Sequence, residues 1–393
     1  MSPRVFLHVG SPKTGTTFLQ NVLWAQRPLA REQGLLLPLD RFADHYLASL
    51  DVRGIAGEPH HPPRALGMWQ RVVEQSLAFD GSVLISHELF AAATAEQARA
   101  AVASFGSEAE VHVVLTARDL VRQIAAEWQE HVKHRSSTPF GDFARELRED
   151  ADKAGWFWRV QSFPGVLERW GADLPPERVH LVTVPPSGTA PSVLWDRFAS
   201  LLGLVPSEFD LDVGRSNSSL SVTGAELLRR VNVELGDRLP LPGPYPTVVK
   251  NVLAHRVLAD RPGPPLVLAA DDVAYARHES LALVDELTAL GVDVVGDLAE
   301  LVPEPAPDAP SSDDAYRPRS TEDLLQEGVG ALADLLVIMS GRLESERNAA
   351  EIARAARERP VRFAAARAAE RRPWLMRVRR AYDRLLSVPR RRH

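Results

Sequence analysis

The sequence predicts an α/β fold of three layers, in which a central parallel sheet of four to five strands is flanked by helices, followed by a C-terminal helical extension. Two observations favour this class. Short apolar runs rich in β-branched residues alternate with segments of helical periodicity, as strand–helix–strand units do. Helical segments, and not Asn-Gly hairpin turns, separate the runs, and strands joined through helices usually lie parallel.

Four strands are expected, at residues 5–9, 82–86, 111–116 and 179–184 (VFLHV, SVLIS, VHVVLT and VHLVTV). Helical periodicity covers residues 16–26, 96–105, 120–134 and 190–202, and further helices are expected at about 222–236 and 274–290. The order of these segments places a helix after each strand, which predicts strand–helix–strand units throughout the first 300 residues.

Three regions are expected along the chain: an α/β domain at 1–300, a linker at 301–320, and a helix with a basic tail at 321–393. The linker is rich in Pro, Ser and Asp and cannot bury a core. Apolar residues recur every three to four positions over 321–350, which predicts an amphipathic helix that can pair with a second copy of the chain, pack on the main domain, or bind another partner. Residues 351–393 hold fourteen Arg against four acidic residues, typical of a solvated tail or of contact with an anionic membrane.

Composition excludes several classes of protein. The 393 residues include no Cys, which excludes disulfides, thiolate zinc sites and a cysteine nucleophile. The histidines and acids show no metal-ligand spacing, so no metal is expected. No run approaches the ~18 apolar residues of a membrane span, and no signal-peptide pattern opens the chain. The expected location is cytoplasmic, with the basic tail available to the inner face of the membrane, and no specific nucleic acid is expected as a partner.

Lysine is rare in this chain. Only Lys13, Lys133, Lys153 and Lys250 are lysines among the 46 basic residues. Much of this bias is expected to be genomic, so a lysine that has been kept is a candidate for a specific role.

A glycine-containing loop joins the first expected strand to the first helix. It reads GSPKTGTT from Gly10 to Thr17. A strand, a tight turn and a helix N-terminus bring unpaired N–H groups together and bind anions such as phosphate. Gly10 and Gly15 keep the spacing of a nucleoside-triphosphatase loop, but Thr16 occupies the lysine position of that motif. The lysine lies at Lys13, where it suits one activated 5′ phosphate better than ATP. A plain strand-to-helix turn is the structural alternative.

The segment SPKTGTTFLQ resembles the 5′-phosphosulfate loop of bacterial sulfotransferases, which have a P-loop-like fold and use 3′-phosphoadenosine 5′-phosphosulfate (PAPS) without a metal. The resemblance covers roughly residues 1–300 and implies that Lys13 is catalytic. It also implies that the loop binds the donor through Ser11, Pro12, Lys13, Thr14, Gly15, Thr16 and Thr17.

A second anion site is expected after the strand at 111–116, because PAPS also carries a 3′ phosphate. Arg118 follows this strand, where its guanidinium can hold a phosphate with two N–H groups. The family places a serine eight residues after this arginine, but here that residue is Ala126. Arg122 or a later loop is expected to compensate for the missing hydroxyl. The structural alternative for Arg118 is a helix cap or an ion pair with an acid.

Two proton acceptors, His87 and Glu88, follow the strand at 82–86. Sulfuryl transfer to a hydroxyl needs a base, and family members use either a histidine or a glutamate near this place. We favour Glu88 as the base, with His87 orienting it or contacting the acceptor. The alternative is that the pair caps the following segment.

A weaker signal comes from the segment RSNSSL that ends at Leu220. It resembles a family segment in which Asn217 closes over the 3′ phosphate, or it is a simple helix cap.

The function that the sequence predicts is transfer of the sulfuryl group from PAPS to a hydroxyl of a carbohydrate, lipid or natural product. A P-loop-like nucleotide kinase is one alternative, although it would require a lysine at position 16. A nucleotide-binding scaffold with weakened catalysis is another, suggested by Ala126.

Overall fold

The computed structural model describes residues 2–150, 153, 155–214, 219–306, 309–310, 316 and 320–358. The chain forms two compact units, Met1–Gly328 and Val329–His393. The helix α14 (Thr321–Glu358) begins in the first unit and continues into the second. The expectations for Asn217 and for the Arg-rich tail beyond residue 358 fall outside the described residues.

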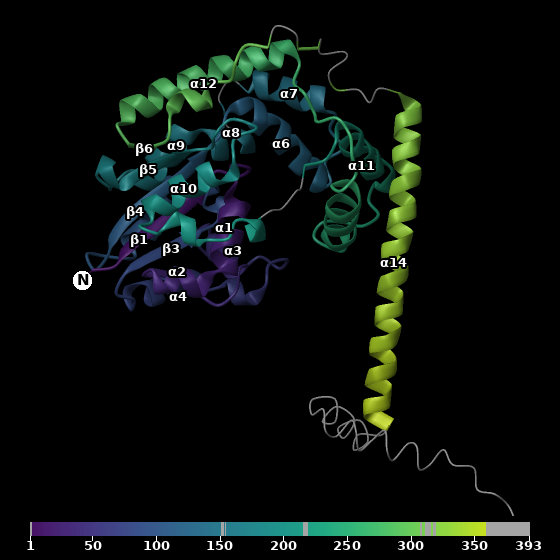
Figure 1. The fold of residues 1–393 in the computed structure, drawn as a ribbon, viewed down its shortest axis with the longest axis horizontal. Coiled ribbons are helices and arrows are strands. Elements are labelled where there is room, and N and C mark those ends of the chain that lie inside the picture. The colour runs from purple at the N-terminus through teal and green to yellow at the C-terminus, as the bar shows by residue number, and fades with distance from the viewer. Residues whose placement is uncertain are drawn as a thin grey trace, which may run out of the picture. The chain divides into compact units, whose positions relative to one another are not determined.

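The α/β fold is confirmed (Figure 1). Across the described residues, one all-parallel sheet has six strands in the order β2-β3-β1-β4-β5-β6. The four expected strands are present as β1 (Arg4–Gly10), β3 (Ser82–Ser86), β4 (Glu110–Ala117) and β5 (Val179–Thr183).

Two short edge strands bring the sheet beyond the four to five strands expected. They are β2 (Leu35–Leu36), with 2 residues, and β6 (Asp293–Val295), with 3. Neither is long enough to produce a readable alternation in the sequence.

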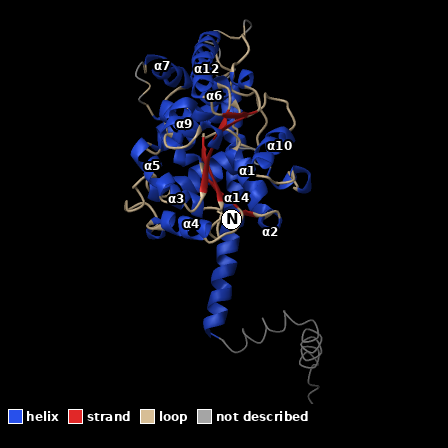
Figure 2. Cartoon of the chain, turned by 90° about the vertical axis from the view of Figure 1, so that its left-hand side faces the viewer, coloured by secondary structure: helices blue, strands red, loops and turns tan. Residues whose placement is uncertain are grey.

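Helices cover both faces of the sheet (Figure 2). Helices α1 (Thr16–Ala25), α2 (Arg27–Glu32) and α10 (Pro191–Leu201) lie on one face, and α5 (Ala95–Ala103) and α9 (Phe163–Gly171) lie on the other. On the first face, Trp195 and Phe198 of α10 share a buried cluster with Phe6, Leu84 and Val114 of the strands. Because both faces are covered, every residue of β3 and β5 is buried, which explains their continuous apolar runs.

The remaining helices extend this framework. They are α3 (Asp44–Val52), α4 (Met68–Leu77), α6 (Leu120–Lys133), α7 (Phe140–Glu149), α8 (Trp156–Gln161), α11 (Val222–Leu235), α12 (Ala270–Leu290) and a π-helix at Pro246–Leu258. Helix α6 follows β4 directly and carries most of one wall of the site described below.

The boundary of the first unit lies at Gly328, later than the expected 300. Part of the expected linker packs on this unit, because the ring of Tyr316 lies 4.4 Å from that of Phe140 and its hydroxyl accepts a hydrogen bond of 2.7 Å from the Ala269 N–H. An aromatic side chain can thus anchor a segment that is otherwise polar.

One helix among the described residues bears on the expectation that no membrane span is present. Residues 321–354 form a helix that is long and apolar enough to cross a membrane by length and composition, with a mean hydropathy of 1.4 over an 18-residue window. Glu327 and Asp334 interrupt its Leu-rich pattern, so no unbroken apolar run is visible, although the average is high. The same length and composition also occur in helices that do not enter a membrane.

Leu115 tests whether β4 is the centre of this framework. Its side chain is fully buried at 0% exposure, whereas Leu66 is 61% exposed. We expect Leu115→Ala to lower the free energy of unfolding by about 2–5 kcal/mol because it leaves a cavity in the core. Urea denaturation measures this. Leu66→Ala is the control, with an expected change within about 0.5 kcal/mol, and equal effects of the two substitutions would contradict the assignment of the core.

Candidate active site

The loop between β1 and α1 presents a helix N-terminus without a side-chain cap. Gly15 precedes α1 with a φ of 84°, a left-handed conformation that favours glycine. A Cβ on this residue would lie 2.7 Å from Cδ2 of Leu194, so a larger residue would also collide with α10. The N–H groups of the first turn of α1 are consequently placed to bind an anion.

Buried hydrogen bonds hold this loop in place on the side that faces the protein interior. The Thr116 hydroxyl donates to the Gly10 carbonyl at 3.0 Å, and the Ser11 N–H donates to the Thr116 carbonyl at 3.0 Å. The hydroxyl of Ser11 donates to the Val160 carbonyl at 2.7 Å, and that of Thr14 donates to the Ser11 carbonyl at 2.5 Å. The hydroxyls of Ser11 and Thr14 therefore hold the loop in place from the protein side.

Gln123 connects the loop to Arg118. Its side-chain amide donates to the Pro12 carbonyl at 2.9 Å and to Gln161 at 2.6 Å, while its oxygen accepts from Nε of Arg118 at 2.7 Å. Gln123 has 0% exposure, so it makes these bonds in the interior, where leaving one unmade would cost about 1–3 kcal/mol. The positions of the loop and of Arg118 thus depend on one side chain.

Arg118 and Arg122 have different surroundings. Arg118 also donates to the Arg122 carbonyl at 3.0 Å; burial and the nearby Arg122 lower its pKa to about 10, so it stays cationic at neutral pH. Arg122 pairs with Asp119 and donates to the carbonyls of Pro185 and Val184 at 3.0 and 3.3 Å. The cationic head of Arg122 is engaged away from the cavity described below, so the structure does not bring it to the other expected donor ligands.

His87 and Glu88 lie where β3 ends. Nδ1 of His87 accepts a hydrogen bond of 3.2 Å from the Leu89 N–H, so His87 caps the 3-10 turn at Glu88–Ala92. Burial lowers the pKa of His87, and the ring is neutral at pH 7 with its proton on Nε2. Burial would raise the pKa of Glu88, but His87 and Lys13 outweigh it and hold that pKa below its usual range. Of the two side chains, the anionic Glu88 is the one ready to accept a proton.

A cavity of about 830 Å³ brings the predicted clusters together. It is lined by the loop residues Pro12, Lys13, Gly15, Thr16 and Thr17, by His87 and Glu88, and by Arg118 and Ala126. The Thr16 hydroxyl donates to Glu88 at 3.4 Å, which connects the loop to the predicted base. All three clusters follow β1, β3 and β4, so they meet at the carboxyl ends of adjacent parallel strands, as ligand sites in open α/β sheets do.

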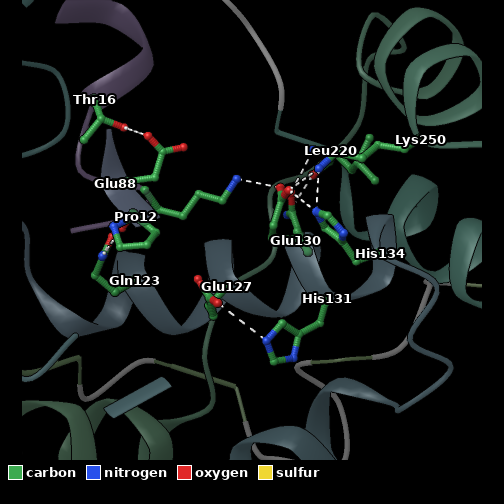
Figure 3. Close-up of polar contacts among 12 residues, drawn as sticks. Pro12, Thr16, Glu88, Gln123, Glu127, Glu130, His131, His134, Leu220 and Lys250 are labelled. Carbon is green, nitrogen blue, oxygen red and sulfur yellow. Dashed lines mark hydrogen bonds and ion pairs between the residues drawn. The ribbon is translucent and has the colours of Figure 1, made fainter. Parts of the chain in front are cut away.

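Sequence reasoning missed the wall of the cavity formed by α6 and the π-helix. Glu127, Glu130, His131 and His134 share one face of α6 and its C-terminal end, and Lys250 reaches Glu130 from the π-helix (Figure 3). Tyr46 and Trp156 add aromatic surface to the same cavity. The rarity of lysine was the available signal for Lys250, whereas no sequence motif marks Glu130.

The segment before α11 meets this wall through the residues that the structure describes. The Leu220 backbone exchanges two hydrogen bonds with the Gln129 side chain, at 2.9 and 3.1 Å, and Ser219 lines the cavity. Asn217 itself lies outside the described residues.

One surface cluster was not expected. Among the described residues, Glu58, His60 and His61 place their ligand atoms within 4.8 Å of one another. Exposed groups of this kind are common without a metal ion.

The chain matches no family model, no curated protein and no solved structure. The resemblance to sulfotransferases therefore remains one of sequence motifs, and the chemistry proposed below follows from the geometry of the cavity.

Two buried histidines beneath the site make stability depend on pH. Burial lowers the pKa of His8 and of His45 from 6.5 to about 4, and His8 contacts the Ser86 hydroxyl at 2.8 Å. Between these pH values the unfolded chain binds protons that the folded chain does not. The free energy of unfolding should therefore have its full value above pH 6.5 and should fall as the pH decreases toward 4.

Urea denaturation across this pH range measures the effect. We expect the decline to be shallower in His8→Gln, which removes one of the two groups. The same slope in His8→Gln and the unchanged chain would show that His8 is not the buried neutral group.

Proposed function

We propose that this protein is a sulfotransferase that moves the sulfuryl group of PAPS to a hydroxyl acceptor. One observation carries the proposal: Lys13, Glu88 and Arg118, together with the uncapped start of α1, line a single cavity at the carboxyl ends of three adjacent strands. The cavity volume of about 830 Å³ lies within the ~300–1,000 Å³ usual for small-ligand sites.

The donor lies with its 5′ phosphosulfate against the N–H groups of Thr16 and Thr17 at the start of α1. The helix dipole and these N–H donors stabilise the negative charge of the phosphosulfate. Arg118, held by Gln123, takes the 3′ phosphate. Arg118 is cationic and fixed, which suits a phosphate that stays unchanged during the reaction.

The reaction is one in-line displacement at sulfur. Glu88 accepts the proton of the acceptor hydroxyl while that oxygen forms a bond to sulfur. The bond between sulfur and the bridging oxygen breaks, and its electron pair stays on the 5′ phosphate of the leaving nucleotide. Lys13 neutralises the charge that develops there. His87 lines the same cavity, and because its Nδ1 accepts from the Leu89 N–H, its Nε2–H is the group that can donate a hydrogen bond to the acceptor.

The acceptor is a molecule with a hydroxyl, of the carbohydrate, lipid or natural-product class. The aromatic rings of Tyr46 and Trp156 give the cavity apolar surface for a ring or a chain. The guanidinium of Arg53 lies over the Trp156 ring, 5.9 Å from its centroid, as in a cation–π contact.

The Thr16–Glu88 contact supports a second candidate, a nucleotide kinase. A hydroxyl at the start of the helix beside a carboxylate at a strand end is the arrangement with which P-loop enzymes hold Mg²⁺. The absence of a lysine at position 16 argues against it, and binding measurements separate the two candidates. Tight binding of ATP with Mg²⁺, and none of adenosine 3′,5′-bisphosphate, would favour the kinase.

Transfer of labelled sulfate from PAPS to a panel of sugars, lipids and phenols tests the proposed activity. Lys13→Ala should lower kcat by about 10²–10³-fold, because it removes the charge that stabilises the leaving group. Glu88→Gln should lower it by about 10²–10⁴-fold, because it removes the base while keeping the shape. Leu66→Ala is the control on the exposed surface. Turnover that survives both site substitutions would overturn the assignment of this cavity.

Ala126→Ser tests the position of the 3′ phosphate. Ala126 lines the cavity at the place where the resemblance calls for a serine. We expect the added hydroxyl to tighten binding of adenosine 3′,5′-bisphosphate by about ten- to a hundredfold, since a hydrogen bond to a charged group contributes about 1.5–3 kcal/mol. Binding of adenosine 5′-phosphate, measured in parallel by calorimetry, should stay unchanged. An equal change for both nucleotides would place the 3′ phosphate elsewhere.

A further inference from the structure

Three of the four lysines of this chain gather around one carboxylate, that of Glu130. Nζ of Lys13 lies 2.5 Å from Oε2 of Glu130, and Nζ of Lys250 lies 2.7 Å from Oε1. Lys133 is close enough to both lysines for their charges to help lower its pKa, after burial, to about 8. The fourth, Lys153, pairs with Glu279 at 2.5 Å.

Glu130 is a permanent anion in this cluster. Burial would raise its pKa, but the hydrogen bond from His134 and the charges of Lys13 and Lys250 outweigh burial and hold the pKa far below its usual range. The side chains of Lys13, Lys250 and Glu130 are each only 21–27% exposed, so solvent screens their pairing less than it would on the surface. The Lys13–Glu130 pair is therefore one that an incoming ligand must compete with.

The position of Glu130 holds the Lys13 ammonium away from the N–H groups at the start of α1, which bind the phosphate in the proposed function. Helix α6 begins at Leu120, so Glu130 lies about 15 Å along the helix from its start, beside which Arg118 lies. Figure 3 shows Thr16 and Glu88 on one side of the cavity and Glu130, His134 and Lys250 on the other. The backbone of Lys13 lies on the first side, in the loop, and its side chain contacts Glu130 on the second.

We propose that Glu130 is a latch that holds Lys13 off the donor site until the phosphosulfate displaces it. This inference rests on the proposed function and deepens it. When the donor binds, the ammonium of Lys13 moves from Glu130 to the oxygen that bridges phosphate and sulfur. Lys250 and His134 keep the Glu130 carboxylate paired after Lys13 leaves. Glu130 is thus a positioning residue that acts through Lys13.

Two consequences follow from this competition. Donor binding must break one ion pair, so Glu130 weakens the affinity for the nucleotide. After transfer, renewed pairing of Lys13 with Glu130 helps to release the bisphosphate product, and product release limits kcat in many enzymes. A chain without the latch should consequently bind the nucleotide more tightly and turn over more slowly.

Calorimetry with adenosine 3′,5′-bisphosphate on the full chain tests the latch by a double-mutant cycle. We expect Glu130→Gln to tighten binding by about five- to thirtyfold, the factor that one or two kcal/mol gives. In the Lys13→Ala background the same substitution should have less than half of that effect on the logarithm of the affinity. Simple removal of a negative charge would act equally in both backgrounds.

Glu130→Asp distinguishes the effect of the latch from the effect of removing a negative charge. It also provides the test if Glu130→Gln folds poorly. It keeps the anion for Lys250 but shortens its reach toward Lys13, so binding should tighten about threefold or more. The matched control is Glu226→Gln, because Glu226 pairs with Arg229 and Arg230 at 2.7 and 2.8 Å outside the cavity lining. It should leave affinity unchanged.

The outcomes separate the two proposals. Affinity that is unchanged or weakened by Glu130→Gln, or raised equally with and without Lys13, would overturn the latch and leave the sulfotransferase proposal standing. No binding of adenosine 3′,5′-bisphosphate by any variant, including the unchanged chain, would overturn the proposed function and the latch with it.

Discussion

The buried hydrogen bonds beneath the loop between β1 and α1 are the constraint on which the rest of the site depends. A loop that turns its N–H groups toward a ligand leaves carbonyls behind it in the interior, and these need partners. Thr116 donates a hydrogen bond to the Gly10 carbonyl, while Gln123 and Gln161 donate to that of Pro12. Because Gln123 also holds Arg118, the loop and Arg118 share one support and keep their spacing.

The order of the strands puts Glu88 and Arg118 beside this loop. The chain passes from β3 on one side of β1 to β4 on the other, so the segments that follow these strands diverge and leave a crevice above β1. Glu88 enters the crevice after β3 and Arg118 enters it after β4. The parallel sheet therefore determines which residues can meet, and the side chains determine what they can do.

Much of this arrangement could be predicted from local patterns. The four long strands are apolar and β-branched because both faces of the sheet are covered, and a loop rich in Gly and Thr before a helix has a specific physical use. The edge strands β2 and β6 are too short for such a pattern. The wall formed by Glu130 and Lys250 depends on contacts over a separation of 120 residues, for which no local signal exists.

Arg122 and Ser11 show a further limit of prediction from sequence. Both lie in the expected motifs, yet the guanidinium of Arg122 binds Asp119 and backbone carbonyls, and the hydroxyl of Ser11 binds the Val160 carbonyl. A motif identifies a segment of backbone, but packing decides which of its side chains face the ligand.

The division between arginine and lysine in this site follows from what each charge must do. A guanidinium is planar and is held well by several fixed acceptors, as Arg118 is by Gln123 and the Arg122 carbonyl. Such a group binds a phosphate that does not change. The ammonium of lysine is compact and sits on a flexible stem, so it can exchange one anion for another with little change in its surroundings. Lys13 has an acidic partner that is already shared with Lys250, and sharing lets one lysine leave without stranding a buried charge. In a chain that otherwise uses arginine, three of the four lysines gather where the proposed latch requires a positive charge to move.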